Sequence, residues 1–142
     1  MSMNEYDELF DAYAHMPYSM LVDMAKMNMN LFIPELKNLL GVEAAGQFIL
    51  AAICAGIGVN GRKTASEHRL MNDVIGTEDS YENFCELTGV MPVSQAIDIV
   101  DEMTDQLSPD GSAGLLSFCL CFAVADGPLS QAEKNFMIRL FE

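Results

Sequence analysis

An apolar segment in the C-terminal third of the chain constrains the fold most, because it leads directly into a well-marked helix start. Residues 115–125 are almost all apolar, and the turn pair Asp126-Gly127 follows them. Ser130 and Glu133 then form a Ser-x-x-Glu capping box, in which each side chain can accept a free backbone N–H of the first turn. Apolar residues recur at helical spacing after this box (Phe136, Met137, Leu140 and Phe141). The segment therefore predicts two helices joined by a tight turn.

The same arrangement occurs once before, at a distance of 66 residues. Under that shift Thr64 and Glu67 correspond to the two residues of the capping box, and the apolar segment 48–59 takes the place of the later apolar run. Further corresponding pairs are Gly61 with Gly127, Leu70 with Phe136, and Met71 with Met137. We therefore predict an internal helix-turn-helix duplication.

Helical spacing of apolar residues continues through the rest of the chain, whereas the period-two alternation of strands is absent. Pro17 is expected to end the first helix, and Pro34 is expected to begin a short helix that ends near Gly41. We predict an all-α, single-domain bundle of about seven to nine helices. Its expected parts are N-terminal helices (1–42), a first repeat unit (43–75, with helices at 43–58 and 64–75), connector helices (76–108, with a short helix within 77–91) and a second repeat unit (109–142). The segment from Ser108 to Gly111 is expected to form a turn and a helix cap.

The charge balance narrows the classes of partner. The chain carries a net charge of −14, with only seven Lys and Arg residues against 21 Asp and Glu. This balance argues against binding to nucleic acid phosphates and points towards cations or basic protein partners. The apolar runs 48–59 and 113–125 are too short to span a bilayer core of about 30 Å, so no membrane span is expected. The N-terminus has no secretory signal pattern, and we expect a cytoplasmic protein.

The four cysteines do not form a metal-binding or redox motif in the sequence. Cys54, Cys85, Cys119 and Cys121 show no CxxC spacing. Cys119 and Cys121 stand two apart in a predicted helix, so they point to different sides. We expect all four to be small core residues in a reducing compartment.

The turn before the second capping box has the spacing of the second half of an EF-hand loop. With Glu133 at position 12, Gly127 falls at position 6 and Asp126 at position 5. Positions 1 and 3 would be Phe122 and Val124, which offer no side-chain oxygen, so a complete EF-hand is not predicted. A purely structural interpretation also accounts for these residues, since Glu133 caps a helix and Gly127 suits a turn with positive φ.

Residues 18–31 place Met20, Leu21, Met24, Met27 and Leu31 on one apolar stripe. We expect this stripe to fill the core, since methionine adapts to irregular gaps. The alternative is an adaptable surface that binds partner helices.

Catalytic motifs are absent from the sequence. It contains no GxSxG, no phosphate-binding GxxxxGK[ST] and no HExxH. The only histidines, His15 and His68, stand near no paired cysteines. We therefore expect a non-enzymatic protein.

Residues 123–133, Ala-Val-Ala-Asp-Gly-Pro-Leu-Ser-Gln-Ala-Glu, resemble the tellurite-resistance TerB-like family and its A-x-A-D-G-x-[ILV]-[ST]-x-x-E segment. The segment from Ala55 to Glu67 is similar to a degenerate copy of it. The resemblance implies an all-helical, repeat-built bundle. Family members include tellurite-resistance proteins and the cytoplasmic part of a DnaJ-like membrane co-chaperone, and they are associated with stress responses.

The resemblance also implies a metal role for Asp126 and Glu133, which match the family pattern. In the first unit Glu67 is kept, whereas Asn60 replaces the aspartate and Lys63 replaces the apolar residue. The candidate ligands are therefore Asp126, Glu133, Glu67 and Asn60, and the candidate ion is a divalent cation of the Ca²⁺ or Mg²⁺ class.

Three functional hypotheses follow, of which the third, an enzyme with a site assembled from residues that no motif marks, has no support in the sequence. The first is a non-enzymatic, cytoplasmic TerB-like module with a stress-response or scaffold role that binds a divalent cation. The second is an acidic protein–protein interaction module with no metal site, which uses an acidic face or the methionine-rich stripe to bind a basic or helical partner.

Overall fold

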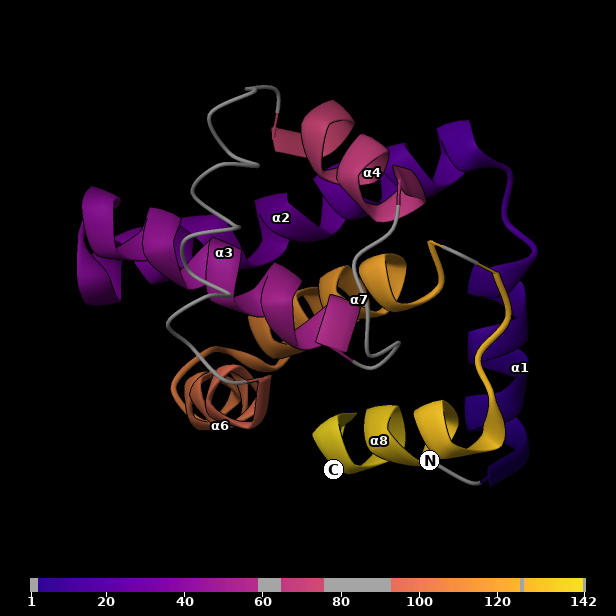
Figure 1. Ribbon diagram of the computed structural model, residues 1–142. Helices are drawn as coiled ribbons and strands as arrows, with labels where there is room; N and C mark the ends of the chain where they lie inside the picture. The colour runs from indigo at the N-terminus through magenta and orange to yellow at the C-terminus, as the bar shows by residue number, and fades with distance from the viewer. Residues whose placement is uncertain (1–2, 59–64, 76–92, 126, 142) are drawn as a thin grey trace.

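Seven α-helices and no strand make up the part of the chain that the computed structural model describes, namely residues 3–58, 65–75, 93–125 and 127–141 (Figure 1). The all-α prediction is confirmed for these residues. The helices are α1 (Met3–Ala14), α2 (Tyr18–Leu40), α3 (Val42–Gly58), α4 (Ala65–Ile75), α6 (Val93–Thr104), α7 (Pro109–Ala123) and α8 (Gln131–Phe141). The short helix predicted within 77–91 lies outside the described residues.

Helix α2 corrects one prediction. Pro17 separates α1 from α2 as expected, but Pro34 lies inside α2 and does not begin a new helix. A proline in a helix interior removes one backbone hydrogen bond and is intrinsically unfavourable by about 3 kcal/mol. Fully buried Phe32 and Leu36 stand on either side of Pro34, so core packing keeps the helix continuous. The helix ends as predicted at Gly41, which has a φ of 86° and donates its N–H to the Lys37 carbonyl.

The helices predicted at 43–58 and 64–75 are confirmed to within one residue as α3 and α4. The bounds of α4 and α8 coincide under the 66-residue shift.

Ser108 caps the N-terminus of α7, where its hydroxyl accepts the Gly111 N–H at 3.1 Å and Pro109 occupies the first helical position.

Helix α7 forms the centre of the bundle and contacts α1, α2, α3, α6 and α8 (Figure 1). Its side chains from Leu115 to Ala123 are buried except for a half-buried Ser117. The Phe118 ring meets Phe32 of α2 edge-on, with ring centroids 5.5 Å apart, and packs against Phe122 at 5.2 Å. The apolar run that dominates the sequence is therefore the helix on which most of the other described helices pack.

A glycine allows α2 and α7 to approach closely. A Cβ placed on Gly114 would lie 2.8 Å from the Leu31 Cβ and 2.9 Å from the Asn28 carbonyl oxygen. Only a residue without a side chain fits there. Asn28 is the one buried polar residue among the described side chains, at 6% exposure.

The first and last helices lie together at one side of the bundle (Figure 1). Lys134 of α8 lies 3.6 Å from an Asp7 oxygen and 3.9 Å from an Asp11 oxygen of α1. Beneath this contact, Met137 of α8 and Phe10 of α1 are buried. None of the helices in the described ranges is both long enough and apolar enough to cross a membrane.

Candidate functional site

The residues predicted to bind a cation are only partly described. Asp126 and Asn60 lie outside the described residues. Glu67 lies in the first turn of α4, but its side chain lies outside the described set as well. Glu133 is described in full, in the first turn of α8.

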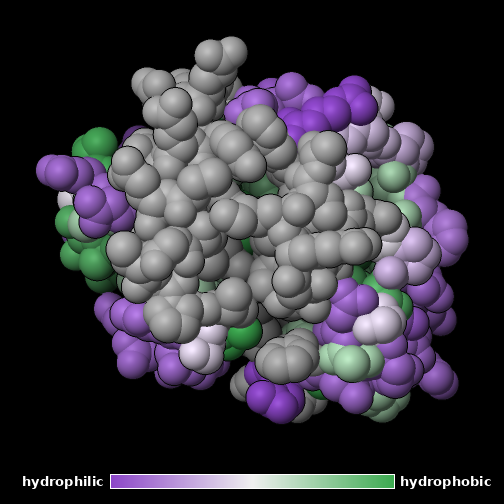
Figure 2. Space-filling view, viewed as in Figure 1, coloured by the Kyte–Doolittle hydropathy of each residue, from purple (hydrophilic) through white to green (hydrophobic). Residues whose placement is uncertain are grey.

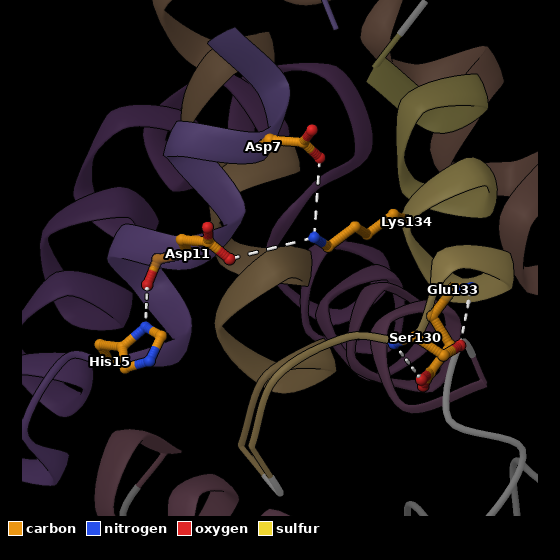
Figure 3. Close-up of polar contacts among 6 residues, drawn as sticks. All are labelled: Asp7, Asp11, His15, Ser130, Glu133 and Lys134. Atoms are coloured by element: carbon orange, nitrogen blue, oxygen red, sulfur yellow. Dashed lines mark hydrogen bonds and ion pairs between the residues drawn. The ribbon is translucent and has the colours of Figure 1, made fainter. Parts of the chain in front are cut away.

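Glu133 forms the predicted capping box (Figure 3). The Ser130 N–H donates to Glu133 Oε1 at 2.8 Å, and the Glu133 N–H donates to Ser130 Oγ at 3.2 Å. Gly127 has a φ of 127°, as expected for the turn that precedes the cap. The capping box and the positive φ of the turn are therefore confirmed, and the metal role of Glu133 stays a prediction. No group of three or more potential metal-binding side chains occurs among the described residues.

The apolar side chains predicted to fill the core from α2 are in large part exposed. Met20, Met27 and Leu31 have exposed fractions of 53%, 56% and 45%. Leu21 is buried as predicted, and Met24 is half-buried against the core. The core prediction was therefore wrong for three of the five residues. The face of α2 that packs inwards is Leu21, Ala25, Asn28, Phe32 and Leu36.

We call the row formed by exposed Met20, Met27 and Leu31 and half-buried Met24 the methionine stripe. Its members are spaced by four, three and four residues, which aligns them along one side of α2. The stripe borders α7, because Leu31 approaches Gly114 closely. Asp23 is exposed and stands three residues after Met20 and four before Met27, which makes it a surface neighbour of both.

A second carboxylate near the stripe, that of Glu35, joins α2 to α7. Its two oxygens accept hydrogen bonds from the Ser108 backbone N–H and the Ser108 hydroxyl, each at 2.7 Å. These hydrogen bonds hold the pKa of Glu35 below its usual 4.5. The sequence indicated the Ser108 cap but not its partner, because no local pattern links residues so far apart in the chain.

Another group of polar side chains joins the start of α2 to α4. The Tyr18 hydroxyl donates to Asp73, and the Arg69 guanidinium lies 4.0 Å from the centre of the Tyr18 ring. Arg69 also lies 3.9 Å from Asp73. Burial first, and then the hydrogen bond to Asp73, raise the pKa of Tyr18 to about 12.

Lys134 points from α8 towards two aspartates of α1 (Figure 3). His15 lies at the end of α1, where its Nδ1 is 2.9 Å from the Asp11 carbonyl oxygen. Its ring is exposed. This group connects the first and last helices of the described chain.

The two cysteines of α7 are buried, as predicted. Burial raises the pKa of Cys119 and of Cys121 to about 12, with the neighbouring thiol a smaller cause for Cys119. The Cys119 thiol lies 3.4 Å from the Ala52 carbonyl oxygen of α3. Thiols in this state are core side chains and poor nucleophiles. The side chains of Cys54 and Cys85 lie outside the described set.

A smaller apolar surface lies at the corner between α2 and α3. Leu39, Leu40 and Val42 are exposed there. Figure 2 shows hydrophobic side chains gathered at this edge of the molecule, beside hydrophilic ones. This corner is separated from the methionine stripe by more than a helical turn of α2.

Comparisons of the chain with protein-family models, curated proteins and solved structures found no match.

Proposed function

We propose that this chain is an acidic, non-enzymatic protein-interaction module that binds a partner helix on the methionine stripe. The observation that carries the proposal is the exposure of Met20, Met27 and Leu31, each at least 45% exposed on one side of one helix. Single exposed apolar residues are normal, whereas an aligned row of them on a monomer is characteristic of an interaction site.

The chemistry of the stripe suits a helical partner. Methionine has three rotatable bonds and a polarisable sulfur, so a row of methionines can adapt to different apolar side chains. The stripe spans three turns of α2, and an amphipathic helix presents apolar residues at the same spacing. Leu31 is supported from below by the close packing of α2 on α7 at Gly114, which gives the surface a rigid base.

A specific observation favours a second candidate function. The bounds of α4 and α8 agree under the 66-residue shift, and Glu67 and Glu133 occupy the same position in their helices. This agreement supports a duplicated, TerB-like pair of units with a cytoplasmic stress-response or scaffold role. In that proposal, Asp126, Glu133, Glu67 and Asn60 contribute oxygens to a Ca²⁺- or Mg²⁺-class cation.

The first proposal is tested with the full chain labelled with ¹³C at the methionine methyl groups. The probes are three helix-forming peptides of about 18 residues, or five turns. All three peptides have the same apolar face, made of leucine. They differ only in the polar face, which is made of lysine in one peptide, glutamine in the second and glutamate in the third. We expect at least one peptide to shift the methyl signals of Met20, Met24 and Met27.

Buried Met71, Met103 and Met137 provide internal controls whose signals are expected to stay in place. The double variant Met20→Gln/Met27→Gln removes apolar surface without changing charge, and it is expected to abolish the shifts in Met24. If none of the three peptides shifts a methyl signal of the methionine stripe, even at the highest peptide concentration, the proposal is refuted.

A further inference from the structure

We propose that the partner helix of the methionine stripe is basic, so that its apolar side packs on the stripe and its cationic residues meet carboxylates beside it. This inference rests on the proposed function and specifies the chemistry of the partner.

The acidic residues beside the stripe are placed on both of its sides. Asp23 neighbours Met20 and Met27 on the surface of α2. On the α7 side, Glu35 stands four residues after Leu31 and is its neighbour on the helix surface, and its carboxylate accepts hydrogen bonds from Ser108 at the start of α7. A helix lying on the stripe therefore has a carboxylate within reach along each edge.

The basic residue nearest to the stripe in sequence is Lys26, which stands three residues after Asp23 and neighbours it on the helix surface. Lys26 is neither three nor four residues away from any member of the stripe, so it projects from another side of α2. Lys134, a further cation of the described chain, is already paired with Asp7 and Asp11 of α1.

A second copy of the chain is a poor occupant of this surface. It would bring another charge of −14 towards a protein of the same charge, and like charges at an interface oppose association. A cationic helix instead meets complementary charge, which speeds association and orients the helix on the stripe.

The test measures the affinity of the lysine, glutamine and glutamate peptides for the full chain by isothermal titration calorimetry. We expect the lysine peptide to bind at least about ten-fold more tightly than the glutamate peptide at low salt, with the difference falling as salt screens the exposed charges. Asp23→Asn is expected to weaken the lysine peptide about two- to five-fold, within the range of exposed ion pairs. Asp98→Asn, an equal charge change at an exposed position of α6, is the matched control and is expected to have a smaller effect.

The outcomes separate the two proposals. Equal binding of the three peptides, or equal effects of Asp23→Asn and Asp98→Asn, would overturn the basic partner and leave the stripe as an apolar docking surface. Preference for the glutamate peptide would do the same. Binding of none of them would overturn both proposals. Sedimentation of the chain alone supplies a further check, because a dimer lost in Met20→Gln/Met27→Gln would make a second copy the occupant.

Discussion

Both carboxylate oxygens of Glu35 accept hydrogen bonds from Ser108, one from its backbone N–H and one from its hydroxyl, each at 2.7 Å. The same Ser108 hydroxyl oxygen accepts the Gly111 N–H inside α7. A side chain of α2 therefore completes the cap of the central helix. This contact holds the two helices together at one end of their crossing, beside the glycine contact between Leu31 and Gly114.

Glu35→Gln is expected to lower stability near neutral pH, because an amide offers only one acceptor oxygen for the two Ser108 donors. The pKa of Glu35 lies below its usual 4.5, so the contribution of the carboxylate is complete above pH 4.5 and is lost as pH falls through the lower folded-state pKa. The stability difference between wild type and variant should therefore shrink as pH falls below 4.5. Urea unfolding across this pH range measures it, and a constant difference would show that ionised Glu35 does not contribute.

Gly114→Ala is expected to destabilise the chain by about 1–3 kcal/mol, the usual range for overpacking a tight site. The new methyl group would meet the Leu31 Cβ at 2.8 Å and the Asn28 carbonyl at 2.9 Å. Gly46→Ala is the matched control at an exposed position of α3, where a Cβ meets nothing within 4 Å. It should stabilise by about 0.5–1 kcal/mol through helix propensity. Opposite signs in urea unfolding are the expected result, and a destabilising Gly46→Ala would contradict it.

Ser130→Ala is expected to cost about 1 kcal/mol by removing the cap of α8. Glu133→Gln should retain most stability, because glutamine can accept the Ser130 N–H in the same capping box. This variant therefore separates the capping role of Glu133 from the charge of its side chain.

Thermal unfolding of metal-stripped protein with added Ca²⁺ or Mg²⁺ tests the cation hypothesis, since a ligand of the folded state raises the midpoint of unfolding. A rise in wild type that Glu133→Gln loses would support a site containing Glu133, and equal responses would exclude Glu133 from it.

Tyr18→Phe is expected to cost about 0.5–1 kcal/mol, because it removes the hydrogen bond to Asp73 but keeps the ring under Arg69. The pKa of Tyr18 is raised from 10.0 to about 12, so its contribution is complete below pH 10.0 and is lost as pH rises through about 12. The ultraviolet titration of wild type minus Tyr18→Phe should show a phenolate appearing later than that of an ordinary tyrosine. A difference curve centred at pH 10.0 would contradict the contact.

Cys119 and Cys121 are expected to resist alkylation in the folded protein. A rise of the thiol pKa from 9.0 to about 12 leaves roughly a thousand-fold less thiolate near neutral pH, and burial excludes the reagent as well. Iodoacetamide labelling followed by mass spectrometry that locates the label measures this protection. Both residues should label readily in urea, and equal labelling rates in native and unfolded protein would contradict their burial.

Local sequence signals predicted the parts of the fold that depend on nearby residues. The Ser130–Glu133 box, the Ser108 cap, the break at Pro17 and the end of α2 at Gly41 each involve groups within one helical turn. Their hydrogen bonds form wherever the backbone turns in this way, so the sequence is sufficient to find them.

The residues around Pro34 in the sequence could not predict that α2 continues through this proline. Proline at that position satisfies the pattern of a helix start as well as that of a tolerated interior residue. The burial of Phe32 and Leu36 on either side decides between them, and that burial depends on α7, more than 70 residues away in the chain.

The sequence by itself determined that this chain is helical, where most of its described helices begin and end, and that α7 is apolar enough to form the centre. It could not determine which side of α2 faces that centre. Two rows with the same four-three-four spacing lie next to each other, Met20–Met24–Met27–Leu31 and Leu21–Ala25–Asn28–Phe32. The first is wholly apolar, yet the second is buried.

Only the tertiary structure selected the second row, in which Phe32 meets Phe118 of α7 edge-on and the Asn28 backbone lies close to Gly114. The physical reason is shape: hydrophobicity favours burying either row, but close packing of two particular helices favours the one whose side chains fit.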